Sequence, residues 1–427
     1  MEMEIQTQIL LSISIAIFIG LILSRFAKLL KLPAVTAYLV AGIIVGPYVL
    51  GSLGFPGIGF IDSEDVGSYS IICDVALGFI AFSMGNEFRL SQLRKTGRQA
   101  TIIGIFQAVV TTLVVDAALI GLSFILPKNM LPLPVAIILG AIAAATAPAA
   151  TLMVVRQYKA KGPLTDILLP VVALDDAVGL IIFAISFGIA NALNSGKIDI
   201  KSVILEPIIE VALSLLLGLF IGALFTFFER FFHSNSKRLS MSVTFVFLTV
   251  AISKINFDFC GVHIAFSSLL VCMMLGSTFC NICDFSEELM HRVERWTAPL
   301  YIIFFVLSGA ELHLSVFKEY GIVIIGIVYI IARSIGKYTG AYVSAKATKC
   351  NDNIVKYLGI TLLPQAGVAL GMAIKAKDIG PEGEIISSIT LFAVLVYELI
   401  GPMLTKISLL KAGDIKPEGK TSARVRT

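Results

Sequence analysis

Long apolar stretches separated by short polar loops run along the whole chain. A stretch of about 17 to 25 apolar residues can cross a bilayer as a helix, because a helix satisfies its backbone hydrogen bonds internally. Thirteen such spans are predicted, and they begin near Ile5, Pro33, Val66, Ala100, Pro134, Leu164, Val203, Leu239, Gly261, Thr297, Tyr320, Ile354 and Ile385. The tenth, Thr297 to Leu312, is short. The pattern therefore predicts an all-α, polytopic membrane protein with thirteen transmembrane helices.

Basic residues gather in every second loop of this arrangement. With the N-terminus outside, the inside loops and the tail hold 24 of the 33 Lys and Arg residues, and the outside loops hold seven. Cytoplasmic loops of membrane proteins carry such an excess. The distribution predicts a cytoplasmic C-terminus, with residues 412–427 forming a short cytoplasmic polar tail. The two remaining basic residues, Arg333 and Lys337, fall inside the eleventh span.

Composition supports the membrane assignment and excludes one class of partner. Hydrophobic residues make up 57% of the 427 residues, charged residues make up 15%, and the mean hydropathy is +0.92. A soluble domain of this length could not bury so much apolar surface, so the solvent of these segments is lipid. The net charge of +4 comes with no basic patch interleaved with aromatics, so nucleic-acid binding has no support.

Two of the predicted spans contain a proline near their middle. The fifth reads LGAIAAATAPAATLMVV and the twelfth reads LGITLLPQAGVALGMAI. Proline removes a backbone donor and clashes with the preceding turn, so each helix is expected to kink or unwind there. The expected break positions are Ala147, Pro148, Thr151, Pro364 and Gln365.

The spacing of these two spans adds a topological argument. They are seven spans apart, so they cross the membrane in opposite directions. Six spans, one linker span and six spans would form inverted six-helix repeats, with one broken helix in each half. Paired broken helices of this kind are typical of transporters whose site lies near the bilayer midplane.

Two adjacent acids, Asp175 and Asp176, lie in the middle of the sixth span. An ionised carboxylate at the bilayer centre costs about 2.5–3.5 kcal/mol on insertion scales, so such acids usually mark ion pathways. Adjacent helical residues point about 100° apart, so one acid can face a cavity while the other faces a neighbouring helix. Arg333 and Lys337 share one helix face and are the basic candidates for that neighbour, although Lys337 could instead extend toward the cytoplasm.

Five segments carry a family resemblance that covers nearly the whole chain. They are LPAVTAYLVAGIIVGP (Leu32 to Pro47), TAPAAT (Thr146 to Thr151), LDDAVGL (Leu174 to Leu180), ARSIGKYTGA (Ala332 to Ala341) and LLPQAGVALGM (Leu362 to Met372). In this order they resemble the sodium/proton exchanger domain of the monovalent cation:proton antiporters, in the branch with thirteen helices and paired aspartates. The paired acids and the two broken helices are the specific part of the match.

The resemblance implies roles for individual residues. Asp176 matches the essential aspartate that binds the transported Na⁺, and Asp175 matches the first acid of the pair, which meets a basic residue on a late helix. Arg333 matches that basic position best, with Lys337 as the second candidate. Thr146 matches a position near the ion in the unwound stretch. No cofactor is implied beyond the transported Na⁺ and H⁺.

The resemblance also implies a domain organisation and an assembly. The exchanger domain covers residues 1–411, with core helices at about 66–190 and 320–405 and dimerisation helices at about 5–50 and 203–312. A homodimer in the lipid bilayer of a prokaryotic cell membrane is expected. Asp74, Asp116 and Glu398 lie in spans but outside the motifs, and they are interpreted as buried, protonated acids, with Glu398 a possible secondary acid of the site.

The sequence thus predicts an antiporter, rather than an enzyme, that exchanges Na⁺ or Li⁺ for H⁺. K⁺/H⁺ exchange remains an alternative, because cation selectivity depends on cavity size and ligand number. An intramembrane aspartyl protease would need carboxylates that converge from different helices, whereas the adjacent pair diverges on one helix. A sodium-gated channel or receptor would need a pore or a sensory domain for which the short loops leave little room.

Overall fold

The computed structural model describes residues 5–30, 32–55, 57–61, 66–67, 69–86, 88–127, 130–195, 206–259, 262–310 and 320–416. The chain divides into two compact units. Unit 1 comprises Met1–Asn86, Gly218–Ile252 and Val271–Leu314, and unit 2 comprises Glu87–Leu217, Ser253–Leu270 and Ser315–Thr427. Each unit therefore joins segments that are far apart in the sequence, and α4 (Ser70–Gly85) belongs to unit 1. The division into core and dimerisation helices stays a prediction.

Helices make up nearly all of the described structure. Unit 1 holds α1 (Ile5–Leu29), α2 (Ala34–Val45), the short 3-10 helix η1 (Gly51–Leu53), α4, nearly all of α10 (Asn235–Ser253) and α12 (Ser286–Ala310). Unit 2 holds α5 (Leu90–Ser123), α6 (Leu133–Ala143), α7 (Pro148–Gln157), α8 (Pro163–Ser195), α13 (Tyr320–Ala347), α14 (Asp352–Thr361), α15 (Gly367–Lys375), η4 (Ala376–Ile379) and α16 (Glu382–Ala412). The helices α9 (Glu206–Glu229) and α11 (Ser268–Ile282) contribute to both units.

The predicted all-α class is confirmed. Among the described residues, seven helical stretches are long and apolar enough to cross a membrane: Thr7–Leu29, Gly97–Ser123, Leu133–Gln157, Pro163–Ala190, Ile208–Glu229, Tyr320–Ala347 and Glu382–Ala412. Three shorter apolar helices are Ala34–Val45, Ser70–Gly85 and Ser268–Ile282. The count of thirteen spans and the inverted repeat remain predictions.

A small hairpin corrects the predicted start of the ninth span near Gly261. Strand β1 (Phe257–Phe259) pairs antiparallel with β2 (Val262–Ile264), and helix α11 begins only at Ser268. Aromatic and β-branched residues favour extended backbone, and these residues alternate with polar ones over both strands. The apolar run there thus includes a strand before its helix.

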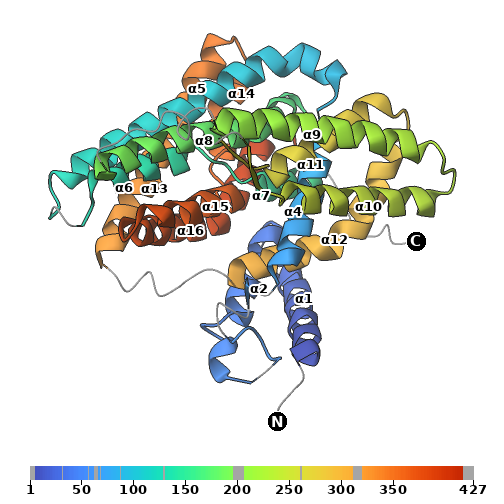
Figure 1. Ribbon diagram of the computed structural model, residues 1–427, viewed down its shortest axis with the longest axis horizontal. Coiled ribbons are helices and arrows are strands. Elements are labelled where there is room, and N and C mark those ends of the chain that lie inside the picture. Colours follow the sequence, from blue (N-terminus) through green and yellow to red (C-terminus); the bar gives the residue numbers. More distant parts are fainter. Residues whose placement is uncertain are drawn as a thin grey trace. The chain divides into compact units, whose positions relative to one another are not determined.

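In unit 1, α2 packs between α1 and α12 (Figure 1). Glycines let the backbones of α2 and α12 approach each other closely. A Cβ added at Gly42 would lie 2.0 Å from the carbonyl oxygen of Val306, and one at Gly309 would lie 2.2 Å from that of Leu39. In lipid the hydrophobic effect does not drive helices together. Small residues at a helix crossing let the backbones come close, so that van der Waals packing can hold the helices together instead.

Unit 2 is built around a long contact between α5 and α13, with α8 against α5 and α6, and α16 against α14 and α15 (Figure 1). The end of α16 holds the start of α8. The Oδ2 atom of Asp414 accepts hydrogen bonds from the backbone N–H of Thr165 at 2.6 Å and from its hydroxyl at 2.7 Å. A carboxylate at a helix N-terminus satisfies orphan donors, so Asp414 caps α8 from a distant segment.

This capping bears on the predicted polar tail. Asp414 and Ile415 are each 4% exposed, and the backbone oxygen of Asp414 accepts a hydrogen bond from the N–H of Lys161 at 2.9 Å. The first residues of the segment 412–427 are therefore packed against unit 2. Residues 417–427 lie outside the described part of the chain.

We expect Gly309→Ala to destabilise the protein, because the new methyl group meets backbone rather than a movable side chain. Overpacking of this kind costs about 1–3 kcal/mol. Gly121→Ala is the matched control, since Gly121 is also helical and has open space around its Cα; it should be neutral or stabilising by up to about 1 kcal/mol. Thermal unfolding in detergent measures both variants, and equal midpoints would contradict the close crossing.

Candidate functional site

Both predicted helix breaks are present in unit 2. Between α6 and α7, residues 144–147 leave the helix, and Pro148 is the first residue of α7. The residue before a proline is driven to extended backbone, and Ala147 has φ −80° and ψ 104°. Between α14 and α15, residues 362–366 form the second break, which contains Pro364. The sequence prediction of two interrupted helices is confirmed.

The two breaks meet each other. The backbone N–H of Ala147 donates to the carbonyl oxygen of Pro364 at 2.8 Å. The side-chain amide of Gln365 donates to the carbonyl oxygen of Ile142 at 3.0 Å and to the hydroxyl of Tyr329 at 2.9 Å. Unwound backbone inside a membrane protein must find partners away from lipid, and here each break supplies part of what the other lacks.

Arg333 of α13 is fully buried beneath this crossing and binds carbonyl oxygens of both breaks. Its Nε donates to Ala143 at 3.0 Å, and its two Nη atoms donate to Leu363 and Ala145, each at 2.7 Å. The guanidinium carbon also lies 4.5 Å from the centroid of the Tyr397 ring. The planar guanidinium has five donors in a fixed fork, so it can satisfy several carbonyls at once.

The basic partner of Asp175 is Lys337. Its Nζ lies 2.9 Å from Oδ2 of Asp175, and both side chains are 0% exposed. The same ammonium donates to the carbonyl oxygen of Ala144 at 2.6 Å and to the hydroxyl oxygen of Thr146 at 2.8 Å. Pro148 has no N–H to bond the Ala144 carbonyl from one turn ahead, which explains why that oxygen is available. A lysine ammonium has three N–H groups, so it can donate to all three of these acceptors.

These contacts overturn the expectation that Arg333 pairs with Asp175. The motif match could not separate two basic residues one turn apart on the same face. The carbonyls of the helix breaks decide between them, because they engage the guanidinium of Arg333 and leave the carboxylate to Lys337.

Asp175 is the centre of the hydrogen-bond group. Its Oδ2 accepts from the hydroxyl of Thr146 at 2.6 Å as well as from Lys337. Its Oδ1 accepts from the side-chain amide of Gln107 on α5, which also donates to the carbonyl oxygen of Gly104 at 3.1 Å. Both carboxylate oxygens are thus bonded, as a buried charge requires.

Gln107 and Tyr329 were missed by the sequence analysis. Both are 0% exposed, and each contacts a residue that was predicted for the site. A signal was present for Gln107, because it is an amide in an otherwise apolar stretch of the fourth predicted span. Tyr329 lies one helical turn before Arg333, a spacing that places the two on one face.

The remaining predicted residues are placed as follows. Asp176 follows Asp175 in α8, and its side chain lies outside the described part of the structure. Thr151 is fully buried in α7, and no hydrogen bond of its hydroxyl is found among the described residues. Glu398 is 3% exposed in α16, next to the Tyr397 that covers Arg333.

The two other intramembrane acids lie elsewhere. The Asp116 carboxylate packs against the Cα of Gly140 where α5 meets α6, since a Cβ there would come 1.8 Å from Oδ1. Asp74 is half-buried on α4 of unit 1. Neither residue takes part in the hydrogen bonds that join Asp175, Thr146 and Lys337.

Comparison with known proteins identifies the family. Residues 13–411 match the family model described as sodium/hydrogen exchanger, transmembrane. The chain belongs to the sodium/hydrogen exchanger family. Among curated relatives, it is 24% identical over 423 residues to the Na(+)/H(+) antiporter NhaS4 of Synechocystis sp. (strain ATCC 27184 / PCC 6803 / Kazusa), covering 94% of this chain and 97% of the relative. It is 23% identical to the high-affinity Na(+)/H(+) antiporter NhaS3 of the same organism, covering 86% and 82%.

A solved structure has the same fold as this exchanger. The sodium proton antiporter MjNhaP1 of Methanocaldococcus jannaschii superposes with a TM-score of 0.70 at 17% identity, covering 96% of this chain and 99% of that one. Membership of the exchanger family confirms the predicted class of transporter, and the chain is not an enzyme. None of these relatives supports the aspartyl protease or the K⁺/H⁺ alternative.

We expect a double-mutant cycle to identify Lys337 as the partner of Asp175. Removing one member of a buried ion pair costs about 3–5 kcal/mol, because the other charge stays buried and unpaired. Asp175→Asn combined with Lys337→Gln should therefore cost much less than the two single changes together. Thermal unfolding of the purified exchanger measures the coupling.

Arg333→Gln supplies the comparison, because it lies one turn away on the same helix and bonds to carbonyls. No hydrogen bond to the Asp175 carboxylate is found for Arg333 among the described residues, so its coupling with Asp175→Asn should be weaker than that of Lys337→Gln. Coupling that is stronger for Arg333 than for Lys337 would contradict the pairing in the structure.

Proposed function

We propose that this exchanger moves Na⁺ against H⁺ by alternating access at the Asp175–Asp176 pair. The observation that carries the proposal is the buried group of Asp175, Lys337 and Thr146, held where two broken helices cross in a chain of the sodium/hydrogen exchanger family. Half-helix ends and unwound carbonyls near the middle of a bilayer are the elements from which transporters build ion sites.

Asp176 is the carboxylate that takes the ion. Asp175 is already neutralised by Lys337 and bonded at both oxygens, so it has little capacity left for a cation. The neighbouring position in the sequence, Asp176, supplies the second carboxylate of the pair. A small hard cation prefers oxygen ligands, and a carboxylate supplies them.

Competition at one carboxylate then enforces exchange. A proton and a Na⁺ each neutralise Asp176, and they cannot both do so at once. An empty site carries one more unbalanced negative charge than the Na⁺-loaded site, so it is the costliest state to move through the low-dielectric barrier. The loaded states cross and the empty state does not, so the two ions are coupled without a separate gate.

Lys337 bears on the number of protons per cycle. An arginine stays protonated in proteins, whereas a buried lysine can release its proton. Because the partner of Asp175 is a lysine, the pair can give up a second proton when Asp176 binds Na⁺. This favours two protons per Na⁺ and therefore electrogenic exchange.

The assembly and the orientation follow the sequence prediction. We infer a homodimer in the cell membrane, with the N-terminus outside and the C-terminus in the cytoplasm. The excess of Lys and Arg in alternate loops supports this orientation.

Asp176→Asn should abolish cation-dependent proton movement in proteoliposomes, because an amide can neither ionise nor exchange a proton for a cation. The measurement is the dequenching of a pH-sensitive dye on addition of Na⁺, Li⁺ or K⁺ in turn. Asp116→Asn is the matched control, since it removes a membrane acid outside the pair and should keep exchange. Exchange that persists in Asp176→Asn would show that Asp176 is not the ion-binding residue. A wild-type response to K⁺ but not to Na⁺ or Li⁺ would show that K⁺ is the transported cation.

Lys337→Arg should keep the ion pair with Asp175 but reduce the number of protons exchanged per Na⁺. The charge next to Asp175 is kept, but its proton can no longer leave. The initial rate of wild-type exchange should depend on a clamped membrane potential, and that of Lys337→Arg should lose this dependence. A wild-type rate that is the same at every imposed potential would contradict electrogenic exchange.

A further inference from the structure

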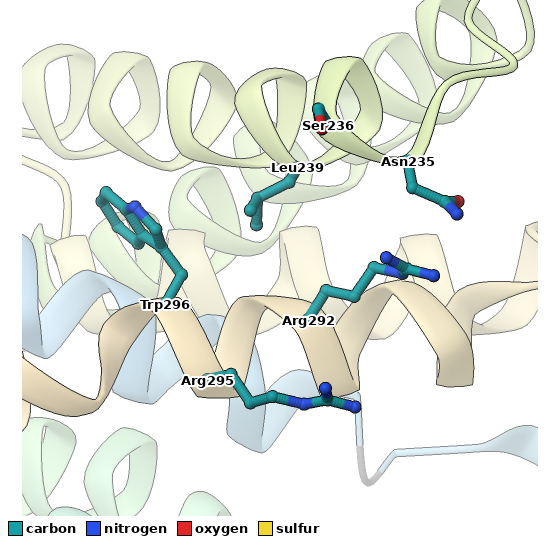
Figure 2. A pocket seen from close by; sticks show the side chains of 6 residues that line it. All are labelled: Asn235, Ser236, Leu239, Arg292, Arg295 and Trp296. Carbon is teal, nitrogen blue, oxygen red and sulfur yellow. The ribbon is translucent and has the colours of Figure 1, made fainter.

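A groove of about 320 Å³ lies between α10 and α12 within unit 1. Figure 2 shows its lining, which consists of Asn235, Ser236, Leu239, Arg292, Arg295 and Trp296. Two of the six residues are arginines and none is acidic. The exchange mechanism uses none of them.

The spans predicted from the sequence place the groove at a membrane boundary. Leu239 begins the apolar run of the eighth predicted span, and Trp296 directly precedes that of the tenth. The apolar helix α9 ends at Glu229, only six residues before Asn235. Four aromatic side chains near these predicted boundaries in the sequence are exposed, and aromatic residues are enriched at membrane–water interfaces; they are Phe227, Phe228, Phe231 and Trp296.

The polar end of the groove suits an anion with several oxygens. In Figure 2 the side chains of Arg292 and Arg295 extend toward the same side as Asn235. One nitrogen of Arg292 contacts the exposed carboxylate of Glu288 at 2.8 Å, which leaves its other N–H groups for a ligand. Guanidinium groups bind phosphate oxygens in bidentate fashion, so two of them can hold one phosphate.

The opposite end of the groove is apolar. Trp296 lies there with Leu239 between it and the arginines (Figure 2). The indole packs against the Phe79 ring of α4 with centroids 5.5 Å apart, which holds it in place while it remains 42% exposed. Both α10 and α12 begin at the polar end of the groove and become apolar in their second halves. The groove therefore changes from polar to apolar along these helices, as a bilayer leaflet does from headgroup to acyl chain.

We propose that this groove binds one anionic phospholipid of the cytoplasmic leaflet. Arg292 and Arg295 hold the phosphate, Asn235 and Ser236 contact the polar headgroup, and the glycerol and the upper acyl chain lie along Leu239 and Trp296. A soluble phosphate would use only the polar end. The exposed apolar end, at the boundary of the bilayer, favours the lipid as the source of the phosphate.

The single tryptophan of the chain allows a direct test, because all tryptophan fluorescence comes from Trp296. The protein is reconstituted in nanodiscs of phosphatidylcholine that contain increasing fractions of brominated phosphatidylglycerol or of brominated phosphatidylcholine. Bromine quenches tryptophan only in contact. Two basic residues near an anionic surface favour such lipids by about 1 kcal/mol each, so half-maximal quenching by the anionic lipid should need about a thirtyfold lower mole fraction.

The variants separate a site from general surface charge. Arg292→Gln/Arg295→Gln should abolish the preference for brominated phosphatidylglycerol. Arg230→Gln/Lys237→Gln removes the same charge from the loop before α10 and the first turn of that helix, outside the groove, and should keep the preference. Equal quenching by both lipids in the wild-type protein, or equal loss in both variants, would overturn the proposal.

A competition arm distinguishes the two sources of phosphate. Inorganic phosphate or glycerol 1-phosphate at millimolar concentration should leave the quenching by brominated phosphatidylglycerol unchanged. Relief of quenching by either compound would show that the groove recognises a soluble phosphate and would overturn the lipid as its ligand. The wild-type comparison does not depend on any variant, so it remains decisive if the arginine substitutions prevent folding.

Discussion

The organisation of unit 2 depends on one constraint, which is the satisfaction of unwound backbone inside a membrane protein. Two proline-containing breaks leave carbonyl oxygens without helical partners, and lipid offers none. Arg333 bonds three of these oxygens and Lys337 bonds a fourth, so α13 holds both breaks through two residues one turn apart. Each cation is thereby kept fully buried with its donors engaged.

The same constraint produces the chemistry. The ammonium group of Lys337 donates to the carbonyl oxygen of Ala144 in the first break, so a positive charge is buried there. The carboxylate of Asp175, on α8, neutralises this charge. Thr146 sits in the break and bonds to both groups, while Gln107 holds the other carboxylate oxygen from α5. Both oxygens of Asp175 are thus engaged, which is why we propose its neighbour, Asp176, as the residue that binds the cation.

Contacts within unit 2 hold the first turn of α8 as well as its middle. Asp414 caps the start of α8 from beyond the end of α16, and Gly162 makes room for it, since a Cβ at that position would lie 2.2 Å from the carboxylate. The helix that carries both acids is therefore held at its first turn and at mid-length.

The sequence by itself determined the class of protein and most of the residues at the crossing. Apolar runs and basic loops indicated a polytopic membrane protein, and two prolines and two adjacent acids inside the spans indicated a transporter with broken helices, because acids and helix breaks are costly in lipid unless they have a function. Only the tertiary structure decided which basic residue meets Asp175, and that Gln107 and Tyr329 join the site. These choices depend on which carbonyl oxygens the crossing presents to α13. Sequence spacing cannot reveal that, since Arg333 and Lys337 lie on the same helix face and differ only in what lies opposite them.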